Sequence, residues 1–558
     1  MTTTRASVDD IATRFWEGFL ERQPIYASLL GDRRYEDRLN DPGPLGRERD
    51  RELVTDALAA IADVDRAALD VEDGITVGML ETIATVHLEQ DAQRLHEFTS
   101  IDHLDGPQGL PGDLARLVAI DSDEALDHLL ARLAAYPAYV DAHIGNIDEG
   151  LASGRTAAPV VFKRTIEQLE RMVASPTDES PLLAGPGANL DDAQRDVLRR
   201  AIEAHVEPAI ERFLAAVRAA APRARAGDGV WALADGEAVY ATAILASTTL
   251  PLTALELHEY GLEQLADIDR DRLTIARELG HDDVASLRSF LQSDPSNFVT
   301  DPNDLVELAR RQIEHAATAA PRWFGRLPKA SCEVRAVEPY AAPEAPTAFY
   351  FPPAPDGSRA GIYFINTHEP ASRPVHQLAS ITYHEAVPGH HFQISIESEL
   401  EALHDLRRFG SRLAGMAYAE GWGLYSERLA DEMGLYEDPR ERLGMLDMQA
   451  LRAARLVADT GLHAFRWTRE EAVDFVEGSG QTRLMAASEV DRYICWPGQA
   501  LAYMVGQREI RALRAEIAAR DGDHFDLQAF HDQAIGHGGM PLATLRAQLP
   551  DWVKPRAD

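Results

Sequence analysis

The segment 384–391, His-Glu-Ala-Val-Pro-Gly-His-His, decides which fold and site we expect. In zinc peptidases, His-Glu-x-x-His on a helix places two imidazoles one turn apart, about 6 Å, so that both reach one tetrahedral ion. The intervening Glu then serves as general base. Here Pro388 occupies the position of the second His. The segment is therefore a stretched form of a zinc motif.

Pro388 and Gly389 predict a break in the helix that carries His384. Proline removes a backbone donor and clashes with the preceding turn, whereas glycine tolerates almost any dihedral angle. The break would return His390 to the place of the missing ligand, and we prefer His390 to His391 for that reason. His391 is then expected to support a ligand or to face the substrate. The alternative interpretation is a helix end with two surface histidines.

The third ligand is expected in the segment 417–427, Ala-Tyr-Ala-Glu-Gly-Trp-Gly-Leu-Tyr-Ser-Glu. A catalytic zinc site needs three protein ligands, often including a Glu, and leaves its fourth position to water. Glu420 is our choice because its small neighbours allow the His384 helix to approach closely. Glu427 lies on the same helix face and is the alternative, or a partner of a ligand. Glu385 is expected to deprotonate the water.

The residues around these segments predict a mainly α fold. Region 1–330 shows one amphipathic helical pattern after another, and residues 253–256 form a capping box before a helix expected over 255–279. Residues 174–191 contain several prolines and glycines and predict a long loop. Helical periodicity returns after residue 375 and continues to the end. We expect region 331–558 to carry the catalytic site, within one continuous unit.

A small sheet is expected just before the metal motif. Residues 333–338, 348–351 and 361–366 are short β-branched or aromatic runs, and residues 352–357 predict a turn between the last two. The run 361–366 is a candidate sheet edge that binds an extended peptide by strand addition. The alternative for this run is ordinary packing.

Composition narrows the possible partners and compartment. The chain has 558 residues and a net charge of −36, which disfavours nucleic acid and anionic membrane surfaces as partners. Only two cysteines occur, Cys332 and Cys495, so a disulfide scaffold and a Cys-based zinc site of the finger type are excluded. The N-terminus lacks the apolar core of a signal peptide, and no apolar run is long enough to span a membrane. We expect a cytoplasmic protein, of undetermined oligomeric state.

The ten residues from His384 to Gln393 resemble the signature of the bacterial "domain of unknown function 885" family. The resemblance extends over nearly the whole chain, through the segments 27–32, 361–367, 420–425, 459–463, 492–493 and 497–503. It implies a metallopeptidase of the Glu-zincin type. It also implies a large helical, cleft-shaped fold similar to oligopeptidases and carboxypeptidases, and we expect the small sheet to lie beside the active site. The substrate is not implied, because the family is poorly characterised.

The resemblance and the needs of peptide hydrolysis suggest further catalytic residues. An oxyanion requires a donor besides the metal. Tyr503 or Tyr493 is our candidate for that role. The alternative for each is a buried, hydrogen-bonded tyrosine of the hydrophobic core. His463 is a candidate catalytic residue on the resemblance alone.

Two arginines are candidate substrate-binding residues. Arg455 or Arg492 would hold a peptide carboxylate, which favours carboxypeptidase action, and Gln499 lies near Arg492 in sequence. The alternative for each arginine is an ordinary ion pair in an acidic chain.

The sequence thus predicts a zinc-dependent metallohydrolase with one Zn²⁺ per chain held by His384, His390 and Glu420. We expect a dipeptidase, carboxypeptidase or oligopeptidase acting on short peptides. A metal-dependent hydrolase of another amide or ester is the first alternative, and a non-catalytic helical binding protein with a relic site is the second. The same ligands would also accept cobalt or manganese.

Overall fold

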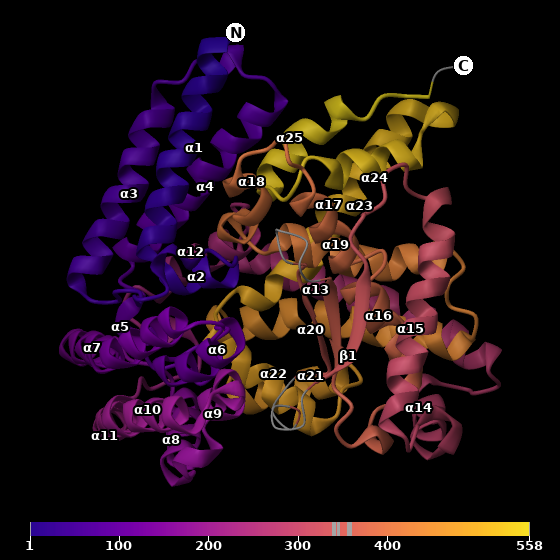
Figure 1. The fold of residues 1–558 in the computed structure, drawn as a ribbon. Coiled ribbons are helices and arrows are strands. Elements are labelled where there is room, and N and C mark those ends of the chain that lie inside the picture. The colour runs from indigo at the N-terminus through magenta and orange to yellow at the C-terminus, as the bar shows by residue number, and fades with distance from the viewer. Residues whose placement is uncertain (1, 338–341, 343–345, 354–359, 557–558) are drawn as a thin grey trace.

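The protein is mainly helical and contains a small sheet near its centre (Figure 1). The computed structural model describes residues 2–337, 342, 346–353 and 360–556. This architecture confirms the predicted mainly α fold with a small sheet. Among the helices described, none combines the length and the apolar character needed to cross a bilayer.

The helices of the N-terminal part form two groups on the left of Figure 1. Helices α1, α3 and α4 pack against one another in the upper group, and α7, α8 and α11 pack together in the lower group. The bounds are α1 Thr2–Arg22, α2 Pro24–Leu29, α3 Pro44–Ala62, α4 Val71–Ala92, α5 His96–Thr99, α6 Leu110–Leu117, α7 Asp123–Ser153, α8 Pro159–Ala174, α9 Pro181–Ala184, α10 Asp192–Ala201, α11 Glu207–Ala220 and α12 Gly236–Thr248.

The remaining helices occupy the centre and the right of Figure 1, where the sheet also lies. Their bounds are α13 Ala254–Glu278, α14 Val284–Ser293, α15 Pro302–Ala319, α16 Leu378–Glu385, α17 His390–Ser398, α18 Asp405–Phe409, α19 Ala417–Glu432, α20 Pro439–His463, α21 Arg469–Gly478, α22 Arg483–Cys495, α23 Ala502–Asp521, α24 Leu527–Gly536 and α25 Leu542–Trp552. The predicted capping box is present before α13: Glu256 N–H donates to Thr253 Oγ1 and the Glu256 carboxylate accepts from Thr253 N–H. The predicted loop 174–191 consists of short helical turns.

The sheet has the order β1-β3-β2, with strands Cys332–Ala336, Ala348–Phe351 and Gly361–Ile365. Strands β2 and β3 pair antiparallel, which agrees with a turn between them, while β1 pairs parallel with β3. Most of the turn predicted at 352–357 lies outside the described residues. The expectation that 361–366 is a sheet edge is wrong, because β3 is the central strand and both of its sides are already paired.

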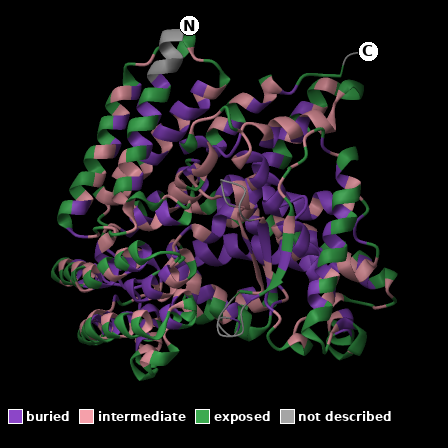
Figure 2. Ribbon diagram, viewed as in Figure 1, coloured by how far each residue is buried: buried purple, intermediate pink, exposed green. Residues whose placement is uncertain are grey.

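Helix α20 runs through the middle of the molecule and is buried on every side from Leu443 to His463 (Figure 2). A helix buried all round must satisfy its polar side chains with internal partners. The buried carboxylate of Asp447 has such partners, since it accepts hydrogen bonds from Arg272 at 2.5 Å and from Arg288 at 3.0 Å. Helix α20 thus brings polar groups into the interior, some of them next to the site described below.

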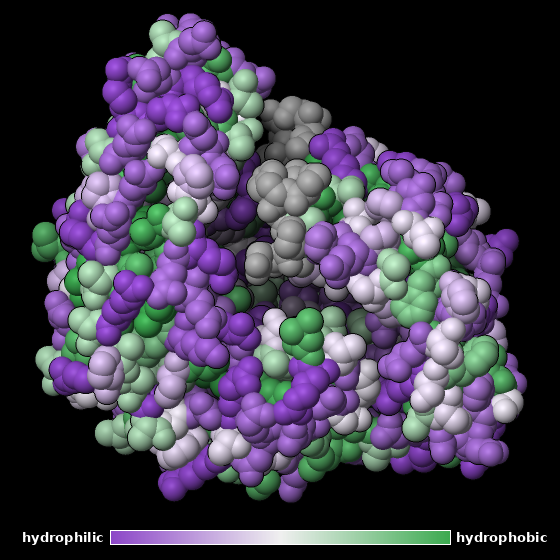
Figure 3. Space-filling view, turned by 90° about the horizontal axis from the view of Figure 1, so that it is seen from below, coloured by the Kyte–Doolittle hydropathy of each residue, from purple (hydrophilic) through white to green (hydrophobic). Residues whose placement is uncertain are grey.

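Two hydrophobic cores hold the fold, and each includes residues from before and after residue 330. The first contains Phe15 and Phe392, and the second contains Phe213 and Tyr493. The boundary between regions 1–330 and 331–558 therefore does not separate one core from the other. On the face seen from below, the surface is hollowed near its centre (Figure 3).

Candidate metal centre

The predicted helix break is present between α16 and α17. Helix α16 ends at Glu385 and α17 begins at His390, with a cis peptide bond between Val387 and Pro388 in the connection. Helix α19 holds the connection in place, because Trp422 Nε1 donates to the Pro388 carbonyl oxygen at 2.9 Å. A Cβ atom at Gly389 would collide with the carbonyl oxygens of His384 and Tyr383, so only glycine fits there.

The break brings His390 beside His384, and both face Glu420. The two imidazole rings are 4.7 Å apart and nearly perpendicular, at 86°. Glu420 Oε2 lies 3.6 Å from His384 Nε2 and 3.5 Å from His390 Nε2. One ligand atom from each of the three residues lies within 4.8 Å of the others. The three predicted metal ligands therefore form one group, drawn from α16, α17 and α19.

The spacing and chemistry of this group fit a zinc ion. Donors bound to tetrahedral zinc at about 2.0–2.2 Å lie about 3.3–3.6 Å from one another. The two distances from Glu420 Oε2, 3.6 and 3.5 Å, lie at the upper end of this range. Two imidazole nitrogens and one carboxylate oxygen are also donor types that zinc prefers.

Glu427 acts on the other side of His384. Its carboxylate accepts from His384 Nδ1 at 2.8 Å and from Gln449 Nε2 at 3.0 Å, and it is fully buried. Metal-binding histidines commonly have their second nitrogen held by a carboxylate in this way. The geometry therefore favours Glu420 as ligand and Glu427 as the partner that orients His384. The Nδ1 atom of His390 is buried and has no hydrogen-bond partner among the described residues.

The electrostatics of the group are dominated by its carboxylates. Burial by itself lowers the pKa of His384, but Glu420 and Glu427 outweigh this effect and raise it to about 9. Burial also disfavours the charge of Glu420, yet the two imidazoles hold its pKa well below the usual value. The site thus stabilises positive charge at the place where the three ligand atoms converge.

Two glycines of α19 permit this close packing. A Cβ atom at Gly423 would lie 2.8 Å from His384 Nε2, and one at Gly421 would meet the backbone of Gly506 in α23. The small residues beside Glu420 therefore do allow the His384 helix to approach, as the sequence predicts. They also bring α23 against α19.

Glu385 and Tyr503 lie next to the predicted ligands. Glu385 ends α16 directly after His384 and is partly exposed, and its charge acts on both His384 and Tyr363. Tyr503, at the start of α23, stacks on His384 with ring centres 6.3 Å apart and planes at 28°. Burial, followed by the charge of Glu420, raises the pKa of Tyr503. Both candidates therefore border the metal group.

Three other candidates, Tyr493, His463 and His391, are directed elsewhere. The hydroxyl of Tyr493 donates to Glu489 at 2.7 Å. His463 is buried with Nδ1 3.2 Å from the backbone nitrogen of Val230 and Nε2 3.0 Å from the carbonyl oxygen of Tyr493, and burial lowers its pKa to about 3. Because the backbone occupies both of its nitrogens, we do not include His463 among the catalytic groups proposed below.

His391 points toward the sheet. Its Nδ1 lies 3.0 Å from the hydroxyl oxygen of Tyr350 in β2, and burial lowers its pKa to about 4. It therefore connects α17 to the strands next to the site and lies outside the metal group.

The predicted substrate-binding residues gather around a glutamate that our sequence analysis missed. Glu489 of α22 accepts from Arg455 at 2.9 Å and from Arg492 at 3.0 Å, and Arg492 also bonds to Gln499. The spacing of Glu489 to Tyr493, four residues along one helix, was a signal that could have identified it. Arg452, also missed, approaches Glu427 at 3.6 Å.

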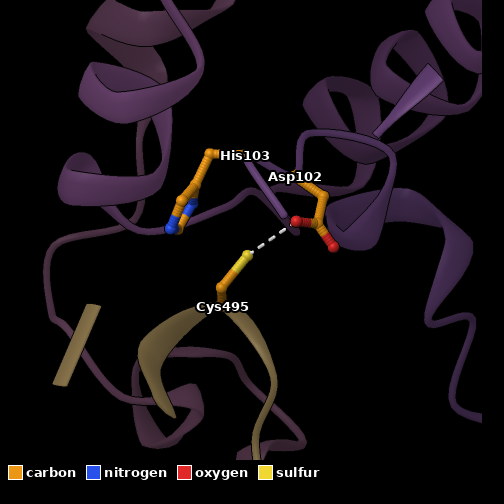
Figure 4. A group of neighbouring side chains, drawn as sticks. All are labelled: Asp102, His103 and Cys495. Carbon is orange, nitrogen blue, oxygen red and sulfur yellow. Dashed lines mark hydrogen bonds between the residues drawn. The ribbon is translucent and has the colours of Figure 1, made fainter. Parts of the chain in front are cut away.

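Two other groups of metal-ligating side chains occur among the described residues. Asp102, His103 and Cys495 point toward one another (Figure 4). There the Asp102 carboxylate already accepts from the Cys495 thiol at 3.2 Å and from Trp496 Nε1 at 2.7 Å. Burial, then Asp102, raises the pKa of the Cys495 thiol well above its usual value, so the thiol keeps its proton.

The remaining group is His96, Glu97 and Glu149. Arg155 pairs with Glu97 at 2.9 Å and Arg47 pairs with Glu149 at 3.0 Å. Because arginines neutralise both carboxylates, this group is less suited to a cation than the one around His384.

The fold and the site define a mainly helical protein with a buried group of two histidines and one glutamate. The chain belongs to the family described as "Bacterial protein of unknown function (DUF885)", whose model matches residues 24–549. The family resemblance inferred from the sequence is therefore confirmed. Among curated proteins, none matches this chain.

Two solved structures of similar fold span almost the whole chain. A candidate lipoprotein from Colwellia psychrerythraea has 26% sequence identity and a TM-score of 0.91, over 98% of this chain and 99% of that one. A candidate lipoprotein of unknown function from Shewanella oneidensis has 20% identity and a TM-score of 0.74, over 96% of this chain and 98% of that one. The second likeness bears on the fold alone.

Proposed function

We propose that this protein is a zinc-dependent metallohydrolase that cleaves short peptides. The observation that carries the proposal is the spacing of His384, His390 and Glu420, with Oε2 of Glu420 at 3.6 and 3.5 Å from the two imidazoles. These three residues would hold the ion. Bound zinc would polarise the scissile carbonyl and increase the acidity of a water molecule. The resemblance to metallopeptidases of the Glu-zincin type supports a peptide as substrate.

The protein's own residues then divide the remaining tasks. Glu385, beside His384 and partly exposed, accepts a proton from the attacking water and returns it to the leaving nitrogen. Tyr503, which stacks on His384, donates a hydrogen bond to the developing oxyanion. Glu427 keeps the His384 ring in orientation through the 2.8 Å contact with Nδ1.

A mixed peptide library tests this function. Zinc-loaded protein should cleave library members, and 1,10-phenanthroline should stop cleavage until zinc is added back, whereas the non-chelating 1,7-isomer should have no effect. Mass spectrometry of the products provides the measurement. If the protein holds zinc and yet cleaves no peptide, the substrate is another amide or an ester and the peptidase proposal fails.

The packing of Gly423 gives a second prediction. In Gly423→Ala the new Cβ lies 2.8 Å from His384 Nε2, so the ring must move and zinc affinity should fall at least about 10-fold. Competition with a chelating dye measures the affinity. Gly112→Ala is the matched control, because a Cβ at that helical glycine meets nothing within 4 Å. Equal zinc affinity in the two variants would contradict this prediction, because it would show that the His384 ring can move away from the new Cβ without weakening zinc binding.

A further inference from the structure

Three arginines gather beside Tyr503, on the side of the metal group formed by α20 and α22. The guanidinium carbon of Arg455 lies 4.6 Å from the centre of the Tyr503 ring, and that of Arg452 lies 5.8 Å from it. Arg492 joins them through Glu489, which it shares with Arg455. Arg455 and Arg452 are buried, with 7% and 9% of their surfaces exposed. Arginine side chains are rarely buried to this extent unless they are paired with an acceptor.

The cluster contains more positive than negative charge. Glu489 lies between Arg455 and Arg492 and also accepts from the Tyr493 hydroxyl. The carboxylate nearest to Arg452 is that of Glu427, at 3.6 Å, and it already accepts a hydrogen bond from His384 Nδ1. Arg455 Nη1 and Arg452 Nε are buried and have no hydrogen-bond partner in the part of the chain that the structure describes. Buried donors of this kind favour an anionic partner.

The cluster lies within a short distance of the metal group. Tyr503 contacts both: its ring centre is 6.3 Å from that of His384 and 4.6 Å from the Arg455 guanidinium carbon. The two are therefore at most about 11 Å apart, the length of about three residues of extended chain. An anion bound at the arginines can belong to the same peptide whose bond is cleaved at the metal.

We propose that Arg452, Arg455 and Arg492 form the subsite for the C-terminal carboxylate of the substrate. This inference rests on the proposed function and narrows it: the substrates are peptides with a free C-terminus, and the released fragment has one to three residues. The planar guanidinium fork matches a carboxylate. Glu489 already occupies the position between Arg455 and Arg492, so the unpartnered Arg455 Nη1 and Arg452 Nε are the donors left for the substrate.

The test uses one randomised tetrapeptide library in two forms, with a C-terminal carboxylate or a C-terminal amide. Full-length Glu385→Gln protein, which lacks the expected base, is equilibrated with each form by dialysis, and retained peptides are quantified by mass spectrometry. The acid form should bind at least about 30-fold more tightly than the amide. In the Arg455→Met background the ratio should fall below about 3-fold, and Arg455→Lys should restore part of it.

Arg508→Met is the matched control, because Arg508 lies on α23 but stacks on Tyr260, with 5.4 Å between the guanidinium carbon and the ring centre. It should leave the ratio unchanged. Both forms are measured on the same sample, so partial unfolding of a variant cancels from the ratio. Equal binding of acid and amide by protein with an intact Arg455 would overturn the subsite, whether or not peptides are cleaved.

Cleavage of peptides much longer than these tetrapeptides by the wild-type protein separates this inference from the proposed function. C-terminal fragments of one to three residues agree with the subsite, and longer or internal fragments contradict it. If the acid form binds more tightly than the amide form but no peptide is cleaved, the hydrolase proposal has failed and the carboxylate subsite stands.

Discussion

Protein purified without chelators should carry about one zinc ion per chain, and Glu420→Ala should carry almost none. Glu420 is the proposed ligand that faces both imidazoles, at 3.6 and 3.5 Å, so its loss removes one of the three proposed donors and the only negative charge among them. We expect zinc affinity to fall by at least about 1,000-fold, given the large binding free energy of zinc in protein sites. Elemental analysis of both proteins gives the metal content.

Glu432→Ala is the control for this substitution. Glu432 lies on the same helix, α19, but pairs with Arg514 at 2.6 Å, so its removal should leave the zinc content unchanged. Wild-type protein that remains free of metal after zinc is supplied would exclude the hydrolase. A non-catalytic helical binding protein would then be the better explanation of the fold.

Glu385→Gln should keep the zinc ion but lose at least about 1,000-fold in kcat/KM for peptide cleavage. The amide has the shape of the carboxylate but cannot take up a proton, and Glu385 is not one of the three converging residues. Peptide turnover and zinc content are measured on the same preparation, so a loss of metal cannot be mistaken for a loss of the base.

Glu385→Asp provides the graded comparison for that result. It restores the carboxylate one methylene group further back, so we expect activity between that of the wild type and that of Glu385→Gln. Undiminished turnover in Glu385→Gln would remove Glu385 from the mechanism and leave another group to accept the proton.

The helix break and the ligand group could be predicted because they depend on local rules. Pro388 and Gly389 restrict or free the backbone whatever surrounds them, so the end of α16 and the start of α17 follow from the sequence. The choice of His390 over His391 follows from the same break. Glu420 could be identified because glycine neighbours on a helix signal close packing.

The parts that escaped prediction depend on contacts between distant segments. That β3 lies in the middle of the sheet is decided by its parallel pairing with β1, which no local pattern reveals. The hydrogen-bond partners of His463 are likewise far from it in the sequence: Val230 precedes it and Tyr493 follows it. Glu489 gains its importance only because α20 and α22 bring two arginines to it.

The same long-range contacts affect how the chain is made. Asp102 bonds to Trp496, 394 positions later, and Tyr26 donates to the carbonyl oxygen of Phe409. At about 5–20 residues per second, a ribosome adds 394 residues in roughly 20–80 seconds. During that time the helices made first expose apolar faces whose partners do not yet exist. The growing chain should therefore depend on chaperones until most of its C-terminal half has emerged.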